Sequence, residues 1–287
     1  MALPALSIGF SPCPNDTFIF HALISGLIPT QGFTLLPETL ADVETLNQWA
    51  MEGRLDVTKL SFHALGHVLD RYVLLSSGAA LGRGCGPLLV SRPELAPEAL
   101  CRQTIAVPGH HTTAAMLLRM CYPECRTIKA MPFERIMPAL VAGEVGAGVI
   151  IHESRFPYQR HGLNLITDLG AWWEMTTGHP IPLGGIAARR TLGMEVISAL
   201  EVAIRTSIQA AYRYPDQATA YIKAHAQELD EQVIKSHIGL YVNDYSLDLG
   251  ADGQAAVQAF LEKGNEVGLL ACDPGRVIST SEGLQHV

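Results

Sequence analysis

The chain has 287 residues, of which 48% are hydrophobic and 17% charged, and its formal net charge is −8. That length is enough for one large domain or two medium ones with proper cores. The acidic balance excludes DNA or RNA as the main partner, because phosphate binding needs a basic face, but it leaves room for a small anionic ligand.

Neither a membrane segment nor an export signal is expected. The amino terminus, Met-Ala-Leu-Pro-Ala-Leu-Ser-Ile, has no basic region followed by a long apolar one. No apolar run approaches the ~18 residues of a membrane span. The six cysteines are scattered without a CxxC pair: Cys13, Cys85, Cys101, Cys121, Cys125 and Cys272. This distribution is typical of reduced cysteines, so the expected location is cytoplasmic.

The first part of the chain alternates short apolar runs with helical patterns. The expected elements are a strand at 6–10, a helix at 16–25 capped by Asn15, a strand at 33–37, a helix at 42–53 capped by Asp42, a strand opening at 55–57, a helix at 61–70 and a strand at 73–80. A glycine-rich joint at 82–86 then leads into a strand at 88–90. The turn before the first helix is rigid, because prolines flank Cys13.

The pattern then repeats. The expected elements are a strand at 104–107, a turn at 108–111, a helix capped by Thr112 to about residue 120, a strand near 127–131, a helix at 134–141 and a strand at 148–151. Pro138 is compatible with its helix only near the first turn. The two series match position by position: Ile8 with Ile105, Asn15 with Thr112, Gly53 with Gly143, and Val57 with Val149. Two series of βαβ units predict two lobes that face each other.

The last third is helical. Within 195–212, apolar residues recur at helical spacing: Ile197, Leu200, Ile204, Ile208 and Ala211. Asp216 and Asp230 are expected to cap two further helices, and 253–267 to form another. We therefore predict an α/β fold of two lobes with mixed, mostly parallel sheets and a helical C-terminal tail. Residues 1–90 plus 186–287 would form the larger lobe and 91–185 the smaller one, with the ligand cleft between them.

Ligands of open α/β sheets bind beyond the carboxyl ends of the strands, which here predicts four loops at 11–17, 58–62, 108–113 and 151–155. Helix N-termini suit a carboxylate, so Thr112 and Thr113 are the preferred anion site. Thr112 could equally be only a helix cap, and so could Asn15 in the opposite turn. His152 directly follows a strand, where a histidine can face the cleft and serve as a general base. The alternative is an ordinary loop histidine.

Other candidate sites are disfavoured. His63 and His67 are four residues apart on one helix, but neither a third ligand nor an HExxH motif accompanies them, so no metal is predicted. Cys13 is a poor nucleophile candidate, because only the helix end would lower its pKa. The motifs of dinucleotide sites, P-loops and nucleophile elbows are missing from the sequence, so neither a dinucleotide site nor a P-loop nucleotide site is predicted.

The octapeptide Ser-Pro-Cys-Pro-Asn-Asp-Thr-Phe at 11–18 closely resembles the N-terminal signature of the 1,4-dihydroxy-6-naphthoate synthase family, which acts in the futalosine route of menaquinone biosynthesis. Segments 59–61 (Lys-Leu-Ser), 109–114 (Gly-His-His-Thr-Thr-Ala) and 151–156 (Ile-His-Glu-Ser-Arg-Phe) are also similar, in the expected order. The resemblance implies a type II periplasmic-binding-protein fold used as a cytoplasmic, cofactor-independent carbon–carbon lyase. It implies that cyclic dehypoxanthinylfutalosine is cleaved to 1,4-dihydroxy-6-naphthoate and that His152 is the catalytic histidine.

The resulting hypothesis gives His152 the role of a general base that removes a proton and starts the cleavage. The substrate carboxylate is expected to bind at Thr112 and Thr113, or at Ser11 and Asn15 in the opposing turn. Ser61 and Lys59 are also expected to bind the substrate. Two alternatives stay open: the chorismate dehydratase of the same pathway, and a non-catalytic solute-binding protein for a small anion. A metal-dependent hydrolase is more distant still. The sequence does not fix the oligomeric state, and a homodimer is one alternative.

Overall fold

A computed structural model of the chain describes residues 3–155, 157–226 and 230–278. Phe156 of the family-like segment at 151–156 lies outside the described residues. The strands are β1 (Ala5–Leu6), β2 (Ile8–Phe10), β3 (Thr34–Leu35), β4 (Thr39–Leu40), β5 (Val57–Ser61), β6 (Tyr72–Leu74), β7 (Ala80–Gly82), β8 (Leu88–Ser91), β9 (Ile105–Val107), β10 (Ile128–Ala130), β11 (Ala147–Ile150), β12 (Asn164–Asp168) and β13 (Ile181–Arg189).

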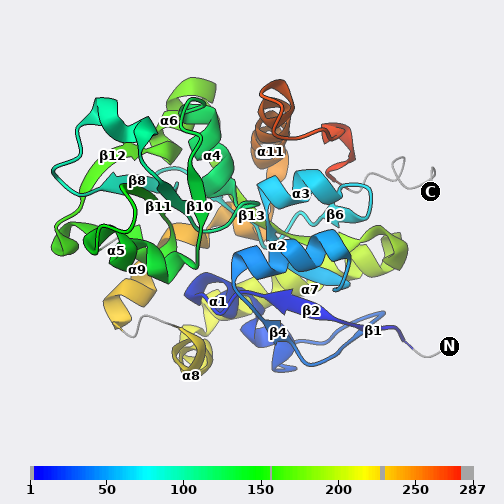
Figure 1. The fold of residues 1–287 in the computed structure, drawn as a ribbon. Coiled ribbons are helices and arrows are strands. Elements are labelled where there is room, and N and C mark those ends of the chain that lie inside the picture. The colour runs from blue at the N-terminus through cyan, green and yellow to red at the C-terminus, as the bar shows by residue number, and fades with distance from the viewer. Residues whose placement is uncertain (1–2, 156, 227–229, 279–287) are drawn as a thin grey trace.

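Helices pack around the strands (Figure 1). The α-helices are α1 (Pro14–Ile24), α2 (Val43–Glu52), α3 (Phe62–Val68), α4 (Thr113–Cys121), α5 (Phe133–Val141), α6 (Leu169–Thr177), α7 (Met194–Arg213), α8 (Pro215–His225), α9 (Glu231–Tyr241), α10 (Asp244–Leu247) and α11 (Gly250–Glu266). Short 3-10 helices are η1 (Pro97–Arg102), η2 (His152–Arg155), η3 (Tyr158–His161), η4 (Arg190–Leu192) and η5 (Pro274–Arg276). Among the described residues, no helix is long and apolar enough to cross a membrane.

Two sheets form the centres of the two lobes. The first has the order β4-β2-β5-β13-β6, with β7 also paired to β13, and the second has the order β10-β9-β11-β8-β12. In each, three strands run parallel, β4-β2-β5 and β10-β9-β11. A fourth strand, β13 in one sheet and β8 in the other, joins them antiparallel. The repeat seen in the sequence therefore corresponds to two sheets of the same strand order.

The prediction of mixed sheets is confirmed, but antiparallel pairing has a larger share than expected. The reason is that β8 and β13, the strands on which the chain crosses between lobes, run against all their neighbours. β8 lies in the second sheet and β13 in the first, and the lobe boundaries stay predictions. The boundaries at 90 and 186 fall inside these strands, a few residues from the change of sheet.

Local turn chemistry explains where the predicted elements fit and where they do not. Asp42, Thr112 and Asp230 cap their helices through side-chain oxygens, as predicted. Asn15 and Asp216 are not caps, because Pro14 and Pro215 already occupy the first helical turn and start each helix earlier than expected. The N-cap of α1 is Cys13.

Two other local predictions are wrong. The strand predicted at 73–80 is broken into β6 and β7, with Gly78 between them at φ 87°. Pro138 lies in the middle of α5 instead of its first turn. Proline has no backbone N–H, so the carbonyl of Glu134, four residues earlier, loses its helical donor. Glu134 and Pro138 are both exposed, so water can bind that carbonyl instead.

The helical tail returns to the first lobe, as predicted. Helix α7 packs against α1, and its stripe of Ile197, Leu200, Ile204, Ile208 and Ala211 is buried. The Ser207 hydroxyl donates to the carbonyl of Ile19 over 2.6 Å and joins the two helices. Helix α9 packs on α1 and also contacts η2 of the second lobe. The tail therefore reaches the contact between the lobes.

The prediction that every cysteine is reduced is wrong for one pair. Cys101 of η1 and Cys125 after α4 form a disulfide across 24 residues. The free cysteines are Cys13, Cys85, Cys121 and Cys272. Spacing alone gave no sign of the bond, because the strand β9 and helix α4 that bring the two residues together lie between them.

The disulfide can be counted directly. Thiol titration of the protein unfolded without reductant should find four thiols, and titration after reduction should find six, in line with the four free cysteines. Replacing both Cys101 and Cys125 by serine should lower the free energy of unfolding by about 3 kcal/mol, since a closed loop of this size restricts the unfolded chain. Six reactive thiols before reduction would contradict the bond.

Candidate functional site

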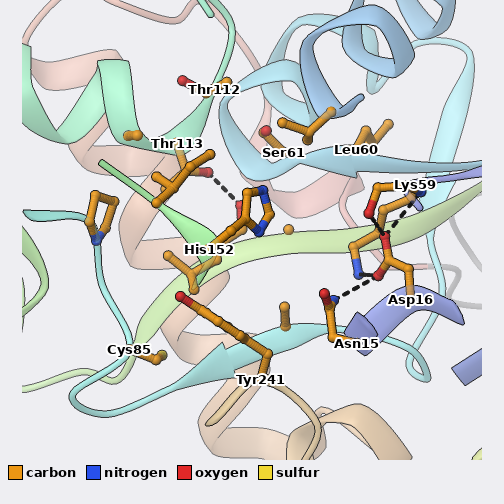
Figure 2. Close-up of a pocket in the computed structure, with 18 residues that line it drawn as sticks. Asn15, Asp16, Lys59, Leu60, Ser61, Cys85, Thr112, Thr113, His152 and Tyr241 are labelled. Carbon is orange, nitrogen blue, oxygen red and sulfur yellow. Dashed lines mark hydrogen bonds and ion pairs between the residues drawn. The ribbon is translucent and has the colours of Figure 1, made fainter. Parts of the chain in front are cut away.

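A cavity lies between the two sheets, beyond the carboxyl ends of β2, β5 and β11 and at the start of α4. All seven residues predicted from the sequence line it: Ser11, Asn15, Lys59, Ser61, Thr112, Thr113 and His152. They come from both lobes, and Figure 2 labels all of them except Ser11. The structure therefore brings the predicted residues together, while their roles toward a ligand stay predictions.

His152 has an unusual backbone. At φ 54° it is the one non-glycine residue with positive φ among those described. A residue other than glycine adopts this conformation at an energetic cost, and such residues cluster at functional sites. The conformation turns the chain from β11 into η2 and leaves the imidazole in the cavity (Figure 2).

The surroundings of the His152 ring favour its neutral form. Its ring packs edge-on against Phe133, with centroids 5.1 Å apart, and stacks on His237 at 5.9 Å. Burial lowers the pKa of His152 below its ordinary value, although Glu153 and Asp16 act in the opposite direction. A neutral imidazole at pH 7 can accept a proton, as a general base must.

A buried ion pair forms one wall of the cavity. Lys59 Nζ lies 2.8 Å from Asp16 Oδ1, and both side chains are almost completely buried. The Ser11 hydroxyl donates to Asp16 Oδ2 over 2.7 Å, and the Asn15 amide donates to Oδ1 over 2.8 Å. Three predicted substrate-binding residues thus each donate a hydrogen bond to one carboxylate. These interactions hold the wall in one conformation and neutralise the buried charges of Asp16 and Lys59.

The opposite wall retains free donors. The Thr112 hydroxyl donates to the Gly109 carbonyl and accepts from Ala115 N, so it is a helix cap. The Thr113 hydroxyl donates to the Leu183 carbonyl over 2.7 Å. Thr113 and Ala114 are the first residues of α4, where backbone N–H groups have no intrahelical acceptor. These N–H groups, not the threonine hydroxyls, are suited to an anion.

Ser61 also keeps a donor for a ligand. Its hydroxyl oxygen accepts from Asn47 Nδ2 over 3.1 Å, and its backbone N–H donates to Asn47 Oδ1 over 2.9 Å. Asn47, on α2, is fully buried and holds Ser61 in place. The hydroxyl hydrogen of Ser61 remains available toward the cavity, next to the start of α4 (Figure 2).

Sequence reasoning missed the residues that the C-terminal tail contributes. Tyr241 of α9 lines the cavity, and its hydroxyl makes no hydrogen bond to another described residue. Burial raises the pKa of Tyr241, so the phenol is protonated and can donate. His237, one turn earlier, is fully buried. The sequence offered one signal, a histidine and a tyrosine four residues apart on one helix face. That pattern alone does not indicate a contact with Asn15, which lies 222 residues away in the sequence.

The predicted absence of a metal site stays a prediction. His63 and His67 gain a neighbour in His111, with ring centroids 5.2 to 6.2 Å apart. Burial lowers the pKa of His63 to about 3, and its Nδ1 contacts the Thr112 carbonyl. Side-chain atoms of Cys13, His152 and Glu153 lie within 4.8 Å of one another, but burial raises the pKa of the Cys13 thiol. That disfavours a thiolate, so we assign neither a metal nor a nucleophile role there.

Comparison with known proteins gives consistent matches. Residues 6–266 match the family model described as menaquinone biosynthesis. The chain is 51% identical to a 1,4-dihydroxy-6-naphthoate synthase of Thermus thermophilus, over 95% of this chain and 98% of the relative. It is 46% identical to a protein of the same name from Streptomyces coelicolor, over 94% and 96% of the two chains.

Solved structures show the same architecture. A protein from Archaeoglobus fulgidus superimposes with a TM-score of 0.87 at 35% identity, covering 93% of this chain and 98% of that one. A Candida albicans protein described as having the generic periplasmic binding protein fold matches with a TM-score of 0.70 at 12% identity, over 96% and 93%. The periplasmic aliphatic sulphonate binding protein of Escherichia coli reaches 0.63 at 15%, over 97% and 93%. The predicted periplasmic-binding-protein fold is confirmed.

Proposed function

The chain belongs to the menaquinone biosynthesis family, and on that basis we propose that it is a 1,4-dihydroxy-6-naphthoate synthase. The reaction is the cleavage of cyclic dehypoxanthinylfutalosine to 1,4-dihydroxy-6-naphthoate, a carbon–carbon lyase step. The observation that carries the proposal is the convergence of all seven predicted residues on one cavity, with His152 inside it. Near-complete coverage of both named relatives supports it.

His152 acts as the general base in this proposal. Its neutral ring accepts a proton from the substrate, the electrons released break a carbon–carbon bond, and the sugar-derived fragment leaves. Aromatisation of the naphthalene ring drives the reaction forward. The substrate carboxylate binds at the first N–H groups of α4 and the Ser61 hydroxyl, where the positive end of the helix dipole favours an anion. Closure of the lobes excludes water and aligns the base.

The protein acts in the cytoplasm without a metal or organic cofactor, and a homodimer stays a prediction. The Cys101–Cys125 disulfide departs from the usual state of cytoplasmic cysteines. The thiol titration described above, repeated on protein isolated with alkylation of free thiols in the cell lysate, measures which state is present there.

Incubation with cyclic dehypoxanthinylfutalosine should produce the absorbance of 1,4-dihydroxy-6-naphthoate, at a rate unchanged by EDTA. Chorismate, tested in parallel, should not be dehydrated. Binding of the cyclic compound without turnover would favour a solute-binding protein instead. Turnover of chorismate alone would assign the sister dehydratase, and loss of turnover with EDTA would indicate a metal-dependent reaction.

A further inference from the structure

Two buried side-chain atoms that lack hydrogen-bond partners face each other beside the His152 ring. Glu153 Oε2 lies 3.6 Å from His237 Nδ1, and the exposed fractions of the two side chains are 13% and 0%. Neither atom has a hydrogen-bond partner among the described residues. A buried polar atom without a partner costs free energy, and native proteins rarely leave two of them in contact.

The hydrogen bond at the other ring nitrogen of His237, Nε2, shows whether Nδ1 carries a hydrogen. Nε2 lies 2.9 Å from Asn15 Oδ1. The Asn15 amide nitrogen already donates to Asp16, so its oxygen must accept, and Nε2 must hold a hydrogen. Burial, and then the neighbouring His152, lower the pKa of His237 well below its ordinary value. The ring is then neutral, and Nδ1 presents a lone pair. If Glu153 were ionised, its Oε2 would face Nδ1 with a lone pair of its own, and two acceptors would repel each other.

The pair joins the two lobes at the proposed base. Glu153 is the second residue of η2, directly after His152, whereas His237 lies on α9, which packs on α1 of the first lobe. The His152 ring stacks on His237, with centroids 5.9 Å apart and planes at 21°. Side-chain atoms of Glu153 and His152 lie within 4.8 Å of each other. A charge on Glu153 therefore acts on His152 at short range.

We propose that Glu153 and His237 share one proton and that this pair, neutral as a whole, is a positioning element that keeps His152 unprotonated. The inference rests on the proposed role of His152 as the general base. One proton on Oε2 or Nδ1 turns two opposed acceptors into a donor and an acceptor, which form a hydrogen bond once the 3.6 Å between them shortens. It also removes the net negative charge beside His152. Without it, a carboxylate next to the ring would favour the imidazolium, which cannot act as a base.

The other charged groups around the pair lie on α1, β5 and η2. On α1 and β5, Asp16 and Lys59 form an ion pair with each other. On η2, Arg155 Nη2 lies 3.7 Å from Asp168 and donates to the Gly84 carbonyl, whereas Arg155 Nη1 is buried without a hydrogen-bond partner among the described residues. Cys13 before α1 and Tyr241 on α9 have pKa values raised by burial and are neutral. The shared proton therefore decides whether Glu153 carries a negative charge beside His152.

His237→Gln tests the proposal. The glutamine amide can replace Nε2 as the donor to Asn15 but offers nothing in place of Nδ1. We expect the pKa of His152 to rise by about one unit or more, as for a base beside an uncompensated carboxylate. The measurement is an NMR titration of histidine ring resonances in the substrate-free protein, with His152 assigned from His152→Gln. The acid limb of kcat/KM should move to higher pH by the same amount.

Glu153→Gln is the matched variant. Its amide donates to Nδ1 and carries no charge, so it should leave the pKa of His152 unchanged and, combined with His237→Gln, return the titration to the wild-type position. A structural role for His237 would show no such rescue. A lower pKa of His152 in Glu153→Gln would mean that Glu153 is ionised in the native protein and would overturn the proposal. An unshifted His152 in His237→Gln would do the same.

These outcomes do not depend on turnover, because the titrations use substrate-free protein. If His237→Gln does not fold, the Glu153→Gln titration alone decides the matter, since an amide of the same size preserves the packing. Wild-type protein that fails to convert the cyclic substrate would overturn the proposed function, whichever way the ring titrations come out.

Discussion

His152→Ala is expected to lower kcat by about 10²- to 10⁴-fold, the usual contribution of a general base. Substrate binding should be largely kept, because the carboxylate donors at α4 and Ser61 do not depend on the imidazole. Turnover is followed by naphthoate absorbance and binding by calorimetry on the inactive variant. His161 of η3, an exposed histidine of the same lobe, provides the control: His161→Ala should retain wild-type kcat.

The pH dependence of the wild type follows from the same ring. Burial lowers the pKa of His152 below its ordinary value of 6.5, so the ring is neutral and active at pH 7. Activity should fall as the pH drops through that lowered pKa and the base becomes protonated. The acid limb of kcat/KM should therefore lie below pH 6.5 and be missing from the residual activity of His152→Ala. Wild-type turnover in that variant would remove His152 from the mechanism.

Lys59→Met is expected to lower the free energy of unfolding by about 3–5 kcal/mol, because it leaves a carboxylate buried without its cation. Asp16 would keep the donors of Ser11 and Asn15 but lose the ammonium 2.8 Å away. Methionine preserves most of the volume of the lysine side chain, so the loss measures the charge and not a cavity. Urea unfolding followed by circular dichroism gives the free energy.

Two comparisons make that measurement specific. Lys263→Met breaks the exposed pair with Glu266 and should cost less than about 1 kcal/mol. The double variant Asp16→Asn, Lys59→Met removes both charges, and its loss should be smaller than the sum of the two single losses. Additive losses, or a Lys59→Met loss no larger than that of Lys263→Met, would show that the buried pair contributes little to stability.

Much of the candidate site could be predicted because its residues lie at the same kind of position, a strand end or a helix start, in both halves of the chain. Strand ends and helix starts recur in the two halves of the chain, and Ser11, Ser61, Thr112 and His152 all lie at such positions. Parallel strands bring their carboxyl ends to one edge of a sheet, so residues at these ends must meet where two sheets face each other. The two lobes and the cavity therefore followed from periodicity and turn residues alone.

What those side chains do inside the cavity required the tertiary structure. Lys59 and Asn15 were expected from the sequence to bind the substrate, and in the fold both donate to Asp16. The Thr112 and Thr113 hydroxyls are bound to backbone carbonyls, which leaves the N–H groups of α4 for an anion. Which acceptor lies nearest to a donor in the folded chain is not visible from residue type.

The sequence by itself determined the fold class, the two lobes and the place of His152 at a strand end, because each depends on periodicity and chain order over a few residues. The tertiary structure alone decided that α9 brings Tyr241 to the cavity and His237 against the His152 ring, and that Cys101 bonds Cys125. His237 meets Asn15 across 222 residues. Contacts over such separations leave no local pattern, since they depend on how whole helices pack, and at this site they set the charge around His152.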